Sequence, residues 1–142
     1  MISEDDNVNV TALKQAYRLW HETKANSVDH WLDLMTEDVK FQSLAAGAQA
    51  MQFTRTSDSK QQVKDYFAGL CADWEMIDYR VDEYIAQGDR VVALCQCSFK
   101  NKRTGKVLDT PKADFHKFRD GKICEFFEFY DTARAIGVAT AP

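Results

Sequence analysis

Residues 109–131 read DTPKADFHKFRDGKICEFFEFYD, and this stretch decides the fold that the sequence predicts. Two runs of alternating polar and apolar residues flank the pair Asp120-Gly121. Such a pair is typical of a tight hairpin turn, because glycine adopts a positive φ without steric cost. The stretch therefore predicts two antiparallel strands joined by a short turn.

The unusual polar residues of the chain gather on one face of this predicted hairpin. Side chains two positions apart share a face of a strand. Antiparallel pairing would then bring Asp114 or His116 close to Glu128. Two acids and an imidazole near aromatic rings are suited to proton transfer, whereas the alternative is a solvated face with cross-strand ion pairs. The shared face holds Lys112, Asp114, His116 and Phe118 from the first strand, and Cys124, Phe126, Glu128 and Tyr130 from the second.

Length and composition indicate a single globular domain over residues 1–142. The 142 residues are enough for one sizeable core, and 45% hydrophobic with 28% charged residues is an ordinary globular balance. A net charge of -4 gives no basic surface for nucleic acid or for an anionic membrane. No apolar run approaches the ~20 residues of a membrane span, and the acidic N-terminus lacks the apolar segment of a secretory signal. We therefore expect a cytoplasmic protein.

The cysteines and histidines do not predict a metal site. The chain has four cysteines and three histidines, which are scattered along it. Cys95 and Cys97 lie in a strand pattern and face the same side, but a zinc site needs further ligands at characteristic spacing. We expect buried, reduced cysteines and neither a metal nor an organic cofactor.

Helical spacing predicts three helices in the first half of the chain. The first opens at Val10, with Asn9 or Thr11 as N-cap, after a disordered segment 1–8. It buries Tyr17 and Trp20 one turn apart.

A short second helix is predicted to begin at Asp29 and to run through Met35, before a strand around Phe41. The partly apolar segment 45–58 is either a cover for a pocket or a mobile surface loop. A serine or aspartate at positions 57–59 caps the third helix, where Ser59 and Gln62 fit a capping box.

From Trp74 onward the hydrophobic period changes to two. It predicts that Ile77, Tyr79, Val81 and Ile85 share one strand face, and that Asp131 caps a final helical turn. Glycines at two positions mark further hairpin turns. Two helices, a strand, a helix and four hairpin-linked strands indicate an α+β fold, in which a curved antiparallel sheet buries one face against the three helices.

This order of elements resembles the NTF2-like superfamily, and within it the SnoaL-like and ketosteroid-isomerase-like proteins. The motifs that carry the resemblance are mainly residues 118–123, FRDGKI, and the pair Tyr130-Asp131. The resemblance covers about residues 11–136. It implies a cone-shaped α+β barrel whose open end forms a small-molecule pocket, and a homodimer paired through the exposed face of the sheet.

The resemblance also assigns a role to Asp114, which lies four residues before Phe118. Ketosteroid isomerases place an oxyanion-stabilising Asp there, and SnoaL-like polyketide cyclases an acid/base Asp. Burial raises the pKa of a carboxyl group, so we expect Asp114 to donate a proton. The position of the isomerases' general base is Ser43, which cannot abstract a carbon-bound proton, so a ketosteroid isomerase is not expected. Tyr17 corresponds loosely to their oxyanion-hole Tyr.

A third pattern comes from limonene-epoxide-hydrolase-like members of the superfamily. They use an Arg and an Asp two residues apart, and an Asp on the last strand that activates water. Lys112 and Asp114 are similar to the first pair, although Lys cannot form a bidentate clamp. Glu128 lies where the water-activating Asp would be.

Together these patterns predict a small enzyme that performs acid/base chemistry on an apolar, oxygenated molecule. Isomerisation, cyclisation and epoxide hydrolysis all fit, with Asp114, His116 and Glu128 as catalytic residues. The alternative is a non-catalytic module that binds a ligand or associates with a protein. The expected substrate-binding residues are Tyr17, Trp20, Trp31, Phe41, Lys112, Phe118, Phe126 and Tyr130.

Overall fold

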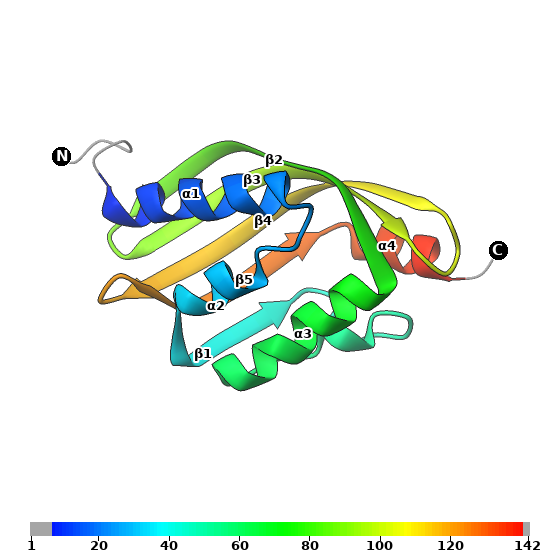
Figure 1. The fold of residues 1–142 in the computed structure, drawn as a ribbon, viewed down its shortest axis with the longest axis horizontal. Coiled ribbons are helices and arrows are strands. Elements are labelled where there is room, and N and C mark those ends of the chain that lie inside the picture. The colour runs from blue at the N-terminus through cyan, green and yellow to red at the C-terminus, as the bar shows by residue number, and fades with distance from the viewer. Residues whose placement is uncertain (1–6, 141–142) are drawn as a thin grey trace.

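A computed structural model describes residues 7–140, which form helices followed by hairpin-linked strands (Figure 1). The predicted order is confirmed, with a longer final helix than expected. Within residues 7–140 no helix is long and apolar enough to cross a membrane. The elements are α1 (Val8–Glu22), α2 (Val28–Asp33), β1 (Met35–Ser43), the 3-10 helix η2 (Gln52–Thr54), α3 (Lys60–Asp73), β2 (Trp74–Gln87), β3 (Arg90–Asn101), β4 (Val107–Arg119), β5 (Lys122–Tyr130) and α4 (Thr132–Ala139).

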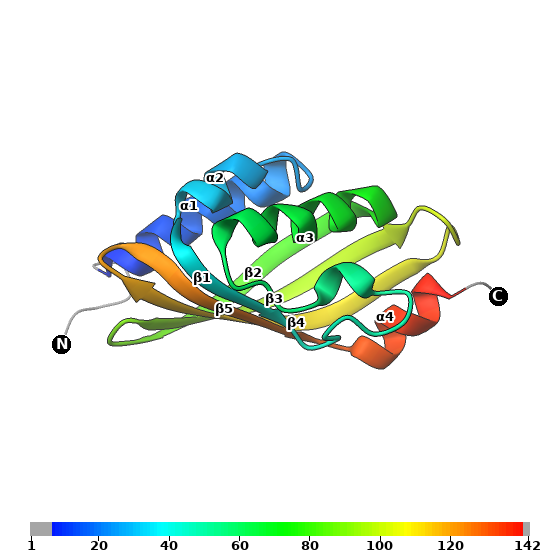
Figure 2. The same cartoon turned by 90° about the horizontal axis from the view of Figure 1, so that it is seen from below.

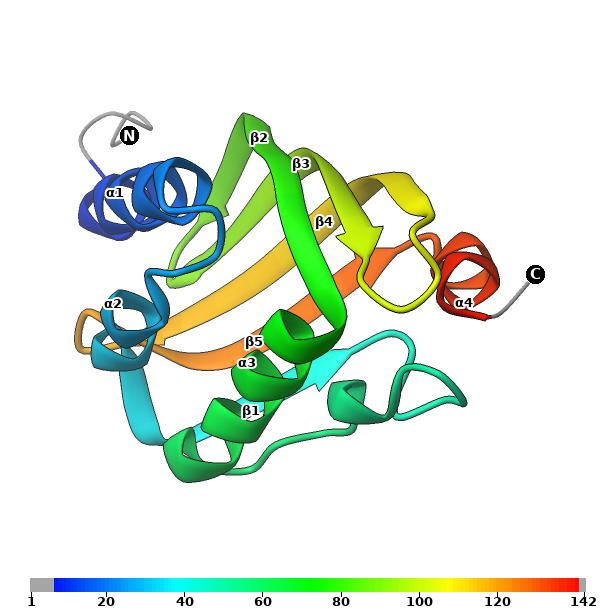
Figure 3. The same ribbon diagram turned by 45° about the vertical axis from the view of Figure 1, so that its right-hand side comes forward.

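The five strands form one curved sheet in the order β1-β5-β4-β3-β2. β1 runs parallel to β5, and all other neighbours are antiparallel. β1 and β2 are the two edges, so the strands do not close into a barrel. α1, α2 and α3 instead cover the inner face of the sheet, and the core lies between them and the strands (Figures 2 and 3). The predicted α+β class is confirmed.

The turn and cap signals of the sequence act as predicted from Ser59 onward. Asp120 and Gly121 both have positive φ, +53° and +80°, at the turn between β4 and β5. Ser59 caps α3 by accepting a hydrogen bond from the backbone N–H of Gln62. Asp131 caps α4 through the backbone N–H of Arg134.

α1 begins earlier than the sequence predicted. Asn7 is its N-cap, because its side-chain oxygen accepts hydrogen bonds from the backbone N–H groups of Asn9 and Val10. Those two residues therefore lie inside the helix. Of the segment 1–8 that was expected to be disordered, residues 7 and 8 are ordered and residues 1–6 lie outside the described part.

α2 is shorter than predicted and ends at Asp33. Met35 already pairs with Ile123 of β5, and the backbone N–H of Ile123 donates to the carbonyl of Leu34 at 2.6 Å. Pairing with a distant strand thus decides the structure of residues whose local pattern is helical.

Strict alternation fails at β-bulges, where an extra residue reverses the faces of a strand. In β5 a register shift against β4 puts Ile123 on the inner face in place of Cys124. In β2 two shifts turn Ile77 and Ile85 outward, where they are 45% and 51% exposed, while Tyr79 stays buried. The predicted faces of Cys124, Ile77 and Ile85 were therefore wrong.

The segment 45–58 packs against α3 through Phe53. The ring of Phe53 lies 5.4 Å from that of Tyr66, measured between centroids. A Cβ atom at Gly69 would lie 2.3 Å from the Cβ of Phe53, which is closer than real atoms approach. Glycine at position 69 is thus what allows the segment to come this close to the helix.

We expect Gly69→Ala to lower the free energy of unfolding by about 1–3 kcal/mol, because Phe53 must move away from α3. Chemical denaturation measures the change. Gly137→Ala is the matched control, since Gly137 is also helical and a Cβ there meets nothing within 4 Å. The control should be neutral or stabilising, and equal stabilities of the two variants would contradict the close packing.

Candidate functional site

The middle of β4 carries three buried or half-buried polar side chains on the inner face of the sheet: Lys112, Asp114 and His116. The β4–β5 register places Asp114, rather than His116, directly opposite Glu128, so one of the two predicted neighbours is confirmed. Asp114, His116 and Glu128 are only 1%, 0% and 3% exposed. The polar face of the hairpin is therefore turned into the core, and the solvated alternative is wrong.

Two tyrosines hold the carboxylate of Asp114. The hydroxyls of Tyr17 on α1 and Tyr79 on β2 both donate to Oδ2, each at 2.7 Å. Their rings are stacked with centroids 5.8 Å apart, so one side of the carboxylate is enclosed. The other oxygen, Oδ1, forms no hydrogen bond with any described residue, although the Lys112 ammonium lies 3.2 Å away.

The Lys112 ammonium connects the two carboxylates of the site. Its Nζ lies 3.2 Å from Asp114 Oδ1 and 3.0 Å from Glu128 Oε1, and it donates to the Tyr79 hydroxyl at 2.8 Å. The second oxygen of Glu128 accepts a hydrogen bond from Tyr66 at 2.8 Å. Burial disfavours the charged amine, but Asp114 and Glu128 outweigh it and hold the pKa of Lys112 well above its ordinary value. Lys112 is therefore a cation.

The proton positions around His116 follow from those of Tyr17. The Nε2 atom of His116 lies 2.7 Å from the Tyr17 hydroxyl oxygen. Tyr17 has one proton, and it must point at Asp114, because two oxygens at 2.7 Å without a proton between them would repel. His116 Nε2 therefore carries a proton and donates to Tyr17. The other ring nitrogen, Nδ1, is left unprotonated, and no described residue hydrogen-bonds to it.

Asp114 is ionised, contrary to the expectation of a proton donor. Burial does raise the pKa of its carboxyl group. However, the Lys112 ammonium and the hydrogen bonds from Tyr79 and Tyr17 stabilise the carboxylate more, and the resulting pKa lies below the ordinary value. Asp114 can thus accept a proton at neutral pH but has none to give.

His116 and the tyrosines are neutral. Burial lowers the pKa of His116 to about 4, because desolvation of the imidazolium outweighs the attraction of Asp114. Burial and then the Asp114 charge raise the pKa of Tyr17 and Tyr79. The tyrosines therefore remain hydrogen-bond donors, and His116 offers a free lone pair at Nδ1.

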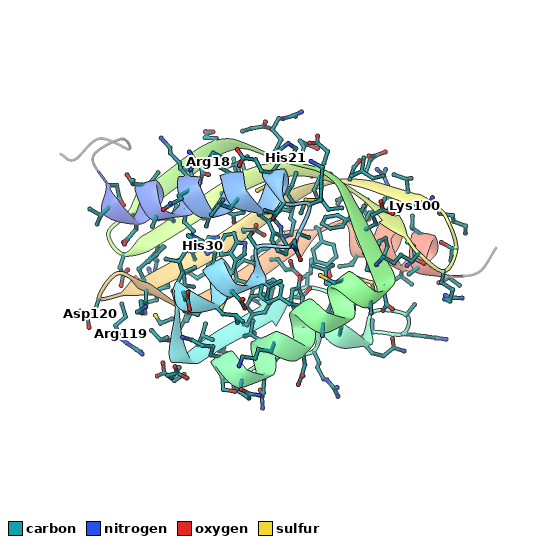
Figure 4. All side chains as sticks on the ribbon, viewed as in Figure 1. Arg18, His21, His30, Lys100, Arg119 and Asp120 are labelled. Carbon is teal, nitrogen blue, oxygen red and sulfur yellow. The ribbon has the colours of Figure 1, made fainter. Side chains whose placement is uncertain are left out.

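These polar groups line a cavity of about 40 Å³ whose other walls are mainly aromatic. The His116 ring is stacked on Trp31 with centroids 6.1 Å apart and an interplanar angle of 6°. Side chains fill most of the space between helices and sheet (Figure 4). The volume admits a water molecule, so a larger ligand must displace side chains. The predicted substrate-binding residues that line the cavity are Tyr17, Trp20, Trp31, Phe41, Lys112 and Phe126.

Two predicted substrate-binding residues lie elsewhere. Phe118 is buried behind His116, with ring centroids 6.4 Å apart, and it does not line the cavity. Tyr130 lines a neighbouring cavity, and its hydroxyl is 2.7 Å from Ser43 Oγ. Among residues 7–140 no group of three or more His, Cys, Asp or Glu side chains could hold a metal ion.

Sequence analysis missed the roles of Tyr79 and Tyr66. Both lie in apolar patterns, and neither was predicted to take part in the site. The one available signal was general: a buried tyrosine hydroxyl needs a partner. Their partners, Asp114 and Glu128, lie on other strands, and no local spacing connects them.

Comparison with protein families identifies the family to which the chain belongs. Residues 13–126 match the SnoaL-like domain. The chain belongs to the SnoaL-like domain family. A comparison with curated proteins found no match.

Solved structures of SnoaL-like and NTF2-like proteins share this fold. An NTF2-like protein of unknown function from Burkholderia pseudomallei is 19% identical, with a TM-score of 0.81 over 95% of this chain and 99% of that one. TerC, co-crystallised with polyporic acid, is 20% identical with a TM-score of 0.77 over 94% and 98%. A candidate SnoaL-like polyketide cyclase from Jannaschia sp. CCS1 is 17% identical with a TM-score of 0.76 over 95% and 93%. The resemblance found in the sequence is thus confirmed for the fold.

The neutral state of His116 makes a pH-dependent contribution to the stability of this SnoaL-like domain. In the unfolded chain the imidazole has a pKa of ~6.5 and binds a proton as the pH falls, whereas the folded state, with a pKa of about 4, does not. The contribution of His116 to the free energy of unfolding is therefore complete above the unfolded pKa and declines as the pH falls towards 4. Asp114 adds little to this slope above pH 5, because the carboxyl group of the unfolded chain, with a pKa of ~3.9, is still ionised there.

From pH 7 to pH 5 we expect wild type to lose about 2 kcal/mol more unfolding free energy than His116→Gln. Denaturant titrations at several pH values measure this difference. His30→Gln, at a half-buried histidine of α2, should retain the wild-type pH dependence. Parallel losses in wild type and His116→Gln would show that His116 is not the group responsible.

Proposed function

We propose that this SnoaL-like protein binds a small, apolar, oxygenated molecule and transfers a proton to or from it with its own side chains. The observation that carries the proposal is Asp114 Oδ1, an acceptor atom of an ionised carboxylate in an aromatic cavity, with no hydrogen-bond donor among the described residues. A buried charged group that is one hydrogen bond short lowers stability. A proton-bearing group of a substrate at Oδ1 would supply the missing contact.

In the proposed reaction Asp114 is the general base. It accepts a proton from a carbon next to a substrate carbonyl, and the electron pair of that C–H bond moves onto the carbonyl oxygen. Once neutral, Asp114 attracts the tyrosine hydroxyls less strongly, so Tyr17 and Tyr79 can donate to the new oxyanion. Return of the proton to another carbon gives isomerisation. Attack of the enolate carbon on a second carbonyl gives cyclisation, and the alkoxide formed there takes the proton back from Asp114.

Hydrolysis of an epoxide is the second candidate, because Lys112 bridges two carboxylates. Glu128 was expected to activate water in this pattern. Its Oε2 accepts a hydrogen bond from Tyr66, and its Oε1 forms an ion pair with Lys112, as Asp114 Oδ1 also does. Either carboxylate can therefore act as the base in this reaction, and Lys112 would protonate the leaving oxygen.

Small-molecule binding also fits the comparison with TerC, whose structure was obtained with polyporic acid. A non-catalytic binding module remains the alternative function. It would use the same aromatic cavity, but it has no need for an ionised base there. Proton transfer therefore accounts for more of the site than binding alone.

We expect Asp114→Asn to lower the rate of catalysed proton exchange at least about a hundredfold, because the amide keeps the shape but cannot accept the proton. Deuterium exchange at the α-carbon of 2-tetralone, followed by NMR, and hydrolysis of styrene oxide cover the two candidate reactions. Glu125→Gln, an exposed carboxylate on the same hairpin, is the control and should retain full rates. Equal rates for Asp114→Asn and wild type would favour the binding module.

We further propose a homodimer that pairs through the outer face of the sheet. The rings of Phe127 and Phe129 on β5 are stacked there with centroids 4.4 Å apart, and Phe129 is 42% exposed. Ile85 on β2 adds a second exposed apolar side chain. A self-complementary apolar patch is what a two-fold symmetric interface requires.

Phe129→Lys should convert the dimer to a monomer, because an ammonium at the centre of an apolar interface has no partner. Light scattering after size exclusion measures the mass. Val8→Lys, at a 78% exposed apolar residue of α1, is the matched control and should leave the dimer intact. A monomeric wild-type protein would contradict this interface.

A further inference from the structure

A second cavity of about 50 Å³ adjoins the candidate active site. We call the cavity that holds Asp114 and His116 the inner chamber. The outer chamber is the neighbouring cavity lined by Met51, Phe53 and Trp74. The two chambers share four lining residues: Tyr66, Leu70, Lys112 and Glu128.

The wall between the chambers is a polar partition made by side chains that bond to one another. Tyr66 donates to Glu128 at 2.8 Å, and Glu128 lies 3.0 Å from the Lys112 ammonium. The Tyr66 hydroxyl has one hydrogen bond in this partition, and its ring packs against Phe41, Phe53 and Phe67. Displacement of Tyr66 would join the two chambers into one elongated cavity.

The buried polar atoms without hydrogen bonds have opposite characters in the two chambers. In the inner chamber both are acceptors, Asp114 Oδ1 and His116 Nδ1. In the outer chamber the atom is a donor, the indole N–H of Trp74, which is only 4% exposed. In residues 7–140 only two other buried side-chain atoms lack a partner, Ser27 Oγ and Thr36 Oγ1, and neither residue lines a chamber.

Unpaired buried polar atoms are costly, and their polarity indicates what would pair with them. We infer that the substrate is an elongated molecule that spans both chambers, with a hydroxyl group in the inner chamber, an apolar middle and an uncharged acceptor oxygen that receives the Trp74 N–H in the outer chamber. This inference rests on the proposed function, because the proposed function is what places the ligand at Asp114.

The acceptor in the outer chamber is an ether, ketone or ester oxygen rather than an anion. Among residues 7–140, Lys112 is the only cation that lines this chamber, and Asp114 and Glu128 already neutralise it. The remaining walls are mainly apolar and include Met51, Phe53 and Phe99. A carboxylate or phosphate there would lose its hydration without gaining a counter-ion.

Two probes that differ only at the far end test the inference: 4-hydroxybiphenyl and 4-hydroxy-4′-methoxybiphenyl. Wild type should bind the methoxy probe about tenfold more tightly, as one added hydrogen bond predicts. Trp74→Phe removes the N–H but keeps an aromatic ring, so it should abolish this preference and leave the affinity for 4-hydroxybiphenyl nearly unchanged. Calorimetry measures the four dissociation constants, and binding of 4-hydroxybiphenyl shows that the variant is folded.

Trp20→Phe is the matched control, because Trp20 lines only the inner chamber. It should weaken both probes alike and preserve the preference. Equal binding of the probes by wild type, or an equal loss for both in Trp74→Phe, would overturn the role of the outer chamber. In that case a loss of both probes in Asp114→Asn would still support the proposed function. If wild type binds neither probe, this inference fails, whereas the proton-exchange rates of Asp114→Asn and wild type test the proposed function separately.

Discussion

The structure depends on the buried carboxylate of Asp114 and on the groups that keep it charged. Desolvating a carboxylate costs several kcal/mol unless fixed donors replace water. Here the donors are Tyr17 from α1 and Tyr79 from β2, with Lys112 two positions away on the same strand. These elements are distant in sequence, so the charge is tolerated only when helix and sheet are correctly assembled around it. The same contacts that keep Asp114 ionised leave it able to accept a proton at neutral pH.

Much of the fold could be predicted because its determinants are local. The turn at Asp120 and Gly121, the cap at Ser59 and the change from helical to alternating period each depend on a few adjacent residues. Alternation predicted that Asp114, His116 and Glu128 share one face of the hairpin, but the exact pairing of Asp114 with Glu128 depends on the register shift between Lys117 and Phe118. The errors lie where distant partners decide the structure, as at Met35, which pairs with a strand almost ninety residues later.

The candidate site was harder to predict than the fold for the same reason. The carboxylates and the imidazole were evident on one strand face, and they do line one cavity. Their ionisation was not evident, because the pKa of Asp114 is set by Tyr17 and Tyr79, and nothing in the local pattern of either tyrosine shows where its hydroxyl donates. An Asp in an apolar pocket keeps its proton, whereas an Asp among fixed hydrogen-bond donors loses it. The local sequence around the Asp can be the same in both cases.

The small volume of the two chambers affects how the proposed ligand could bind. With about 40 and 50 Å³, neither chamber holds a ring, and aromatic side chains occupy the space that a substrate would take. Such packing stabilises the free protein. It also means that binding must displace Tyr66 from Glu128, a hydrogen bond worth about 1–3 kcal/mol next to a charge. A ligand that fills both chambers regains this energy through contacts along its whole length, whereas a short ligand does not. The partition therefore favours elongated molecules over fragments of the same chemistry.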